Sequence, residues 1–141
     1  MLPLTFTVSG EPKSQPRVKA MRCGGFIRIY TPKTADEWKG LVASAARPFL
    51  PAEPIRGPLR LSLAFRFKRP ASHLTSKGAL TKSAPTAHIS KPDTDNLGKA
   101  IMDTLTDVGL WKDDCQVVDL RATKTYDADE GVTINLEQFF P

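Results

Sequence analysis

The sequence predicts one α/β (α+β) domain over residues 1–141, with a single mixed β-sheet and about two main helices. Three observations support this class. Short segments alternate apolar and polar residues as strands do, two longer segments repeat apolar residues with a helical period, and the two kinds are interspersed along the chain. The length and the 40% hydrophobic content are sufficient for one core without disulfide or metal cross-links.

The first half contains three expected strands and one helix. Residues 2–8 alternate apolar and polar residues, residues 10–25 form a basic loop without an apolar period, and residues 26–30 form a short second strand. A capping-box pattern followed by an apolar stripe predicts a helix over residues 33–49. Four prolines then lead to residues 59–67, whose alternation is the clearest strand signal in the chain.

The second half contains a loop, a helix and two strands. Residues 68–90 are rich in Lys, Ser, Thr, Ala and Pro and predict a flexible loop, and loops of this length are often functional. An apolar stripe predicts a helix over residues 96–108, capped by Thr94 or Asp95 and ended by a left-handed Gly109. Strands are expected near residues 115–125 and 131–138. The expected order is therefore β-β-α-β-loop-α-β-β.

Charge is distributed unevenly along the chain. Residues 1–92 hold sixteen Lys/Arg and four Asp/Glu, whereas residues 93–141 hold four and eleven, which recovers the totals of 20 and 15. A basic surface recruits a polyanion through its phosphates, whereas an acidic cluster needs a cation to approach the same polyanion. The pattern favours metal-dependent phosphodiester chemistry on DNA.

The acidic cluster consists of Asp93 and Asp95, followed downstream by Asp113 and Asp114. Two aspartates one residue apart on an extended segment project to the same side. We expect the helix–turn–strand unit that follows to bring the second pair back towards the first. Such a cage of hard oxygen ligands suits Mg²⁺ or Mn²⁺. Two ions held in this way would activate water and stabilise the leaving oxygen.

Lys99 lies one helical turn beyond Asp95 and one turn before Asp103. It could stabilise the charge that develops on the phosphate, or it could form an ordinary surface ion pair. Taken alone, Asp113 and Asp114 are more typical of a solvated turn after a helix, whereas their place directly before an apolar strand favours the ligand role. An EF-hand loop beginning at Asp93 is excluded, because its bidentate glutamate at position 12 would be a threonine here.

Other chemistry lacks support in the sequence. His73 and His88 have no nucleophile or carboxylate at a telling spacing, and no glycine-rich phosphate loop occurs, so we expect neither a catalytic triad nor a nucleotide cofactor. Cys23 and Cys115 lack the C-x-x-C spacing of a zinc site, and Cys115 is expected in the core. No apolar run of about 18 residues occurs. We expect a cytoplasmic protein without a membrane segment.

Basic residues cluster in two segments that together form the expected DNA-binding surface. They are Lys13, Arg17, Lys19, Arg22 and Arg28 in the first segment, and Lys68, Arg69, Lys77 and Lys82 in the second.

Three motifs resemble the RusA family of Holliday junction resolvases: Lys91-Pro92-Asp93-x-Asp95-Asn96-Leu97-x-Lys99, Asp103-x-Leu105, and Trp111-x-Asp113-Asp114-x-Gln116-Val117. The likeness covers residues 91–124 closely, and Gly10-x-Pro12-Lys13, Pro16-Arg17 and Tyr30-Thr31-Pro32 are similar to the opening of its phage-type members.

The resemblance implies a small homodimeric endonuclease, often prophage-encoded, that nicks four-way DNA junctions symmetrically with Mg²⁺ or Mn²⁺ in recombination and repair. It implies that Asp93, Asp95 and Asp114 are metal-binding catalytic carboxylates, that Lys99 is the catalytic lysine and that Asp113 is an auxiliary acidic neighbour. Two alternatives stay open. One is a nuclease acting more broadly on branched DNA, and the other is a junction-binding protein without turnover.

Overall fold

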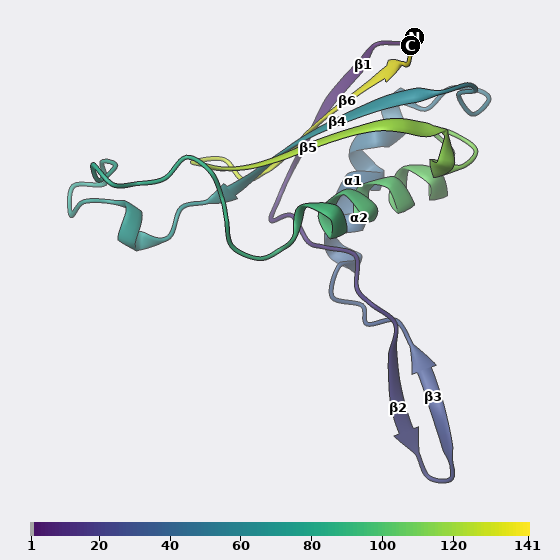
Figure 1. Ribbon diagram of the computed structural model, residues 1–141, viewed down its shortest axis with the longest axis horizontal. Helices are drawn as coiled ribbons and strands as arrows, with labels where there is room; N and C mark the ends of the chain where they lie inside the picture. The colour runs from purple at the N-terminus through teal and green to yellow at the C-terminus, as the bar shows by residue number, and fades with distance from the viewer. Residues whose placement is uncertain (1) are drawn as a thin grey trace.

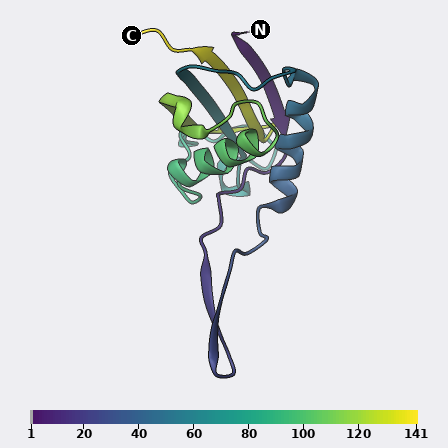
Figure 2. The ribbon, with the colours of Figure 1, turned by 90° about the vertical axis from the view of Figure 1, so that its right-hand side faces the viewer.

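The computed structural model describes residues 2–141 and contains two sheets. A four-stranded mixed sheet has the strand order β1-β6-β4-β5, and a separate two-stranded sheet pairs β2 with β3. Both long helices cover the same face of the larger sheet, while the β2–β3 hairpin projects away from it (Figures 1 and 2). The predicted α+β class with two main helices is confirmed.

The larger sheet is built around β4 (Leu59–Lys68), which pairs antiparallel with β6 (Gly131–Gln138) and parallel with β5 (Val117–Asp127). β1 (Leu4–Ser9) forms one edge against β6. Alternation along β4 buries every second residue, as the sequence predicts for a strand with one covered face. These buried residues are Leu59, Leu61, Leu63, Phe65 and Phe67.

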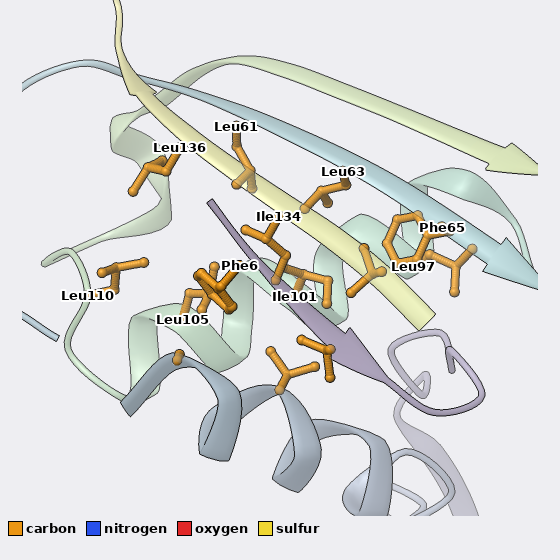
Figure 3. Packing of buried hydrophobic residues seen from close by; sticks show 14 of the residues in the cluster. Phe6, Leu61, Leu63, Phe65, Leu97, Ile101, Leu105, Leu110, Ile134 and Leu136 are labelled. Atoms are coloured by element: carbon orange, nitrogen blue, oxygen red, sulfur yellow. The ribbon is translucent and has the colours of Figure 1, made fainter. Parts of the chain in front are cut away.

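The helix α2 (Thr94–Asp107) crosses the covered face, and its apolar stripe forms the centre of the core. Leu97, Ile101 and Leu105 are fully buried and point towards the sheet (Figure 3). Burial of each such side chain contributes about 1.5–3 kcal/mol to stability. Gly109 has a φ of +84°, and the hydrogen bonds after α2 form a Schellman motif, which confirms the predicted helix end.

The helix α1 (Asp36–Ala46) is shorter than predicted. Its N-cap is Ala35, which has no side chain that can cap the helix. The Asp36 amide donates a hydrogen bond to the Lys33 carbonyl, and this turn places the helix start after Thr34, the first residue of the predicted capping box. The 3₁₀ helix η1 (Arg47–Phe49) follows, since Pro48 lacks the amide that would continue the α-helical pattern. No helix among residues 2–141 is both long and apolar enough to cross a membrane.

The predicted basic loop over residues 10–25 is partly wrong, because it contains the strand β2 (Lys19–Cys23). β2 pairs with β3 (Phe26–Tyr30) through a two-residue turn in which Gly24 has a φ of +59°. A positive φ at the first turn residue is required by a type II′ hairpin turn. The sequence of β2 does not alternate apolar and polar residues as a half-buried strand does, because the hairpin does not pack on a core.

Residues 68–90 are irregular but anchored at several points. They contain the 3₁₀ helix η2 (Ala71–His73), and a bridge between Ala87 and Thr125 adds them to the edge of β5. His88 is 8% exposed and stacks on Phe67 with 4.1 Å between ring centroids. The imidazole is therefore part of a packed aromatic cluster rather than a free loop residue.

Acidification is expected to destabilise the fold through His88. Burial, and secondarily the Lys124 charge, lower the pKa of His88 below its ordinary value of 6.5. Because protonation is less favourable in the folded state, the stability that the neutral ring provides is fully present above the ordinary pKa. It is lost as the pH falls through the lowered pKa of the folded protein. We expect the Tm of the wild type to fall between about pH 7.5 and 5.5, and His88→Phe, which can retain the stacking, to show a flatter profile. A His88→Phe profile parallel to that of the wild type would assign the dependence to other groups.

Candidate metal and DNA site

The N-terminal end of α2 presents two exposed aspartates. Asp93 is the N-cap residue and has an extended backbone, but its side chain makes no capping hydrogen bond. Asp95 lies in the first helical turn. The helix thus begins two residues before the predicted start, and neither Thr94 nor Asp95 is its N-cap. Both carboxylates are exposed, and within residues 2–141 no basic side chain forms an ion pair with either.

Backbone contacts fix this end of the helix. The Lys124 Nζ donates hydrogen bonds to the carbonyls of Ser90 at 2.7 Å and Pro92 at 2.8 Å, and the Gln15 amide donates to the Asn96 carbonyl at 3.0 Å. Lys124 therefore positions the segment that carries Asp93. Lys124 was not among the residues predicted for the site. In the sequence, the pattern that could have indicated this role is a lysine between Ala122 and Tyr126 on the helix-covered side of β5.

An open polar hollow borders Asp93. It is lined by Ser14, Arg17, Lys91, Pro92, Asp93 and Asn96. Two cationic side chains thus lie beside a free carboxylate, an arrangement that suits a phosphate bridged to a cation. Arg17 was predicted to contact DNA, and the structure places it in the same hollow as Asp93, one of the predicted metal ligands.

Lys99 forms an ion pair with Asp103, with 3.8 Å between its Nζ and the carboxylate. The ammonium is well exposed, so the pair is weak and the side chain can reorient. Lys99 still lies on the stripe of α2 that carries Asp95, one turn further along. The surface ion pair and a role beside the carboxylates are thus compatible.

The turn after α2 is held by residues of the third motif. Trp111 is buried, and its Nε1 donates a hydrogen bond to Thr106 Oγ1 at 2.7 Å. The Gln116 Oε1 accepts from the amides of Lys112 and Asp113, while its Nε2 donates to the carbonyls of Ile55 and Gly57. These two side chains therefore have structural roles.

Asp113 and Asp114 differ in their contacts. The Asp113 carboxylate accepts a hydrogen bond from the Cys115 amide at 2.9 Å and caps the 3₁₀ helix η3 (Asp114–Gln116), and this bond holds the pKa of Asp113 below its ordinary value. Asp114 forms no ion pair with any basic side chain in residues 2–141. Cys115 is exposed, so its predicted core position is wrong, because the 3₁₀ turn precedes the strand.

The two acidic pairs lie at opposite ends of α2 and do not meet in one chain (Figure 1). The helix has 14 residues, and a rise of 1.5 Å per residue separates its ends by about 21 Å. Among residues 2–141, no three acidic, histidine or cysteine side chains form a metal-binding group. The expectation that the helix–turn–strand unit returns Asp114 to Asp93 within one chain is therefore wrong.

The other basic residues predicted to bind DNA are spread over the surface. Lys13 forms an ion pair with Glu11 at 3.2 Å, and Lys19 and Arg22 lie on the projecting hairpin. Arg69 lies over the Tyr126 ring and donates to the Pro85 carbonyl, which gives it a structural role in the loop.

Comparison with known proteins agrees with the motifs. The family model for endodeoxyribonuclease RusA matches residues 9–137. An uncharacterized protein of Bacillus subtilis (strain 168), YqaN, is 31% identical over 140 residues, which is 96% of both chains. The family match spans the hairpin, α2 and the turn that carries Asp114. The chain therefore belongs to the RusA endodeoxyribonuclease family.

Proposed function

We propose that the protein is a Mg²⁺- or Mn²⁺-dependent endodeoxyribonuclease that resolves Holliday junctions by paired symmetrical nicks in DNA recombination and repair. The observation that carries the proposal is the pair of free, exposed carboxylates at the N-terminus of α2, bordered by Arg17 and Lys91. Membership of the RusA family supports the nuclease chemistry. A capping role does not account for the Asp93 side chain, which makes no such bond.

The chemistry of the donor set fits a hard divalent cation. Asp93 and Asp95 would hold it, and Asp114, with Asp113 beside it, would complete the ligands from a second copy. When bound, such a cation lowers the pKa of water and offsets negative charge on the phosphate. Arg17 and Lys91 would hold the phosphate next to the cleaved bond. Lys99, after leaving Asp103, would stabilise the charge that develops there.

The proposal includes a homodimer, which the separation of the acidic pairs supports. Carboxylates at opposite ends of a helix about 21 Å long cannot share a cation whose ligands lie at about 2.1 Å. In the proposed two-fold dimer, Asp114 of each copy would lie beside Asp93 and Asp95 of the other, and the symmetry would create two equal sites. Two sites related by a two-fold axis match the symmetry of a four-way junction with paired nicks.

Cleavage of a labelled synthetic four-way junction tests the function, with linear duplex and flap DNA as controls, in Mg²⁺, Mn²⁺ and EDTA. We expect paired nicks in the junction alone and none in EDTA. Equal cleavage of flaps and junctions would indicate a broader branched-DNA nuclease. Tight junction binding without nicks in either metal would indicate a non-catalytic junction-binding protein.

A further inference from the structure

The projecting hairpin, here called the arm, comprises residues 18–30. Its two strands pair with each other and with no strand of the larger sheet, and it extends away from both helices (Figures 1 and 2). An isolated two-stranded hairpin is at best marginally stable in water. A functional partner is therefore expected to cover the arm.

The side chains of the arm are unusually apolar for a fully exposed element. Phe26 is 65% exposed and Ile27 is 67% exposed, and both follow directly after the turn at the tip. Further exposed apolar side chains lie along the arm: Val18, Met21, Ile29 and Tyr30. The arm thus carries an apolar tip without any core to bury it.

The charge of the arm favours a polyanion as its partner. Lys19, Arg22 and Arg28 are its only charged residues, and no Asp or Glu occurs between Glu11 and Asp36. Two such arms packed against each other would place like charges together, which is unfavourable. A DNA strand instead offers phosphates for the basic side chains and bases for the apolar ones.

Pairing across the arm mixes the two kinds of side chain on each face. Arg22 lies opposite Ile27, and Met21 lies opposite Arg28. Each strand has five residues, which corresponds to a reach of about 17 Å. The DNA major groove is only about 8.5 Å deep, so an arm of this length can pass the backbone and reach the bases.

The base of the arm adjoins the proposed metal site. The Gln15 amide is bonded to the Asn96 carbonyl of α2, and Arg17, directly before the arm, lines the hollow beside Asp93. DNA held at the hollow would therefore meet the arm.

We propose that the arm is a DNA wedge, in which Phe26 and Ile27 insert between bases at the junction branch point while Lys19, Arg22 and Arg28 contact phosphates. This inference rests on the proposed junction substrate. Apolar side chains inserted in this way unstack adjacent bases, and the basic residues supply the affinity that offsets the cost of unstacking.

The test uses four-way junctions with 2-aminopurine next to the branch point, bound in EDTA so that no strand is cut. We expect the wild type to raise the fluorescence at least about twofold, because the wedge unstacks the probe. The double variant Phe26→Ala, Ile27→Ala is expected to lose most of this rise. Phe140→Ala, the same change at a residue that is 77% exposed near the C-terminus, is the matched control and is expected to keep it.

Two further measurements separate a wedge from other roles. Arg22→Gln and Arg28→Gln should each reduce the salt slope of junction binding by about one. Light scattering should give the same molar mass for the tip variant and the wild type. A lower molar mass for the tip variant would assign the arm to a protein interface and overturn the wedge. A fluorescence rise that survives Phe26→Ala, Ile27→Ala would also overturn the wedge.

The wedge and the nuclease can fail separately. A wild type that nicks junctions without any fluorescence rise overturns the wedge and leaves the proposed function standing. If the wild type raises the fluorescence, the tip variant does not, and neither protein nicks DNA, the wedge is supported and the proposed nuclease activity is wrong. Thermal melting of the tip variant should match that of the wild type, because the arm lies outside the core.

Discussion

Replacing Asp95 with asparagine is expected to reduce four-way junction cleavage by on the order of 10³-fold, which corresponds to about 4 kcal/mol of transition-state stabilisation. The amide has the shape of the carboxylate but lacks the charge that a divalent cation requires. The fold should be almost unaffected, because Asp95 is exposed and forms no ion pair in residues 2–141. Loss of its favourable interaction with the helix N-terminus costs at most about 1 kcal/mol.

Single-turnover cleavage with saturating protein isolates this effect, and fluorescence anisotropy in EDTA measures junction binding separately. Asp36→Asn is the matched control, because Asp36 is also an exposed aspartate in the first turn of a helix but lies on α1. We expect Asp95→Asn to bind junctions as the wild type does and to cut them far more slowly, while Asp36→Asn cuts normally. An Asp95→Asn variant within tenfold of the wild-type rate would show that this carboxylate does not hold the catalytic cation.

Helices and strands were predictable from the sequence wherever one face is buried, because the apolar residues on that face repeat at a regular spacing. The alternation along β4 and the Leu97, Ile101 and Leu105 stripe of α2 both report on one core, and the end at Gly109 follows from the need for a positive φ. The β2 strand was missed because no core selects the side chains on either of its faces. The Gly24-Gly25 pair between two short strands was the available signal.

The composition of the site was more predictable than its arrangement. Spacing identifies Asp93 and Asp95 as neighbours, since a single residue lies between them. It does not reveal that the turn carrying Asp113 and Asp114 stays at the opposite end of α2 (Figure 1). Lys124 was missed because its role depends on tertiary contacts with the carbonyls of Ser90 and Pro92.

Mixing two inactive variants is expected to restore junction nicking, because the proposed metal site takes ligands from two copies. Asp95→Asn and Asp114→Asn homodimers should both be inactive, since every site in each lacks one ligand. In a mixed dimer, one site combines both substitutions, while the other retains the native Asp95 of one copy and the native Asp114 of its partner. Random exchange gives about half mixed dimers, so about a quarter of the wild-type sites should become active.

The product distinguishes this arrangement from a site within one chain. A mixed dimer has one working site, so we expect single nicks in the junction rather than the paired nicks of the wild type. Mixing Asp93→Asn with Asp95→Asn is the control and should restore nothing, because both substitutions lie on the same half of the site. If Asp114→Asn alone cuts at the wild-type rate, Asp93 and Asp95 bind the cation without it. If both homodimers are inactive and remain so after exchange, the two-fold composite site is wrong, because that site predicts one intact ligand set in every mixed dimer.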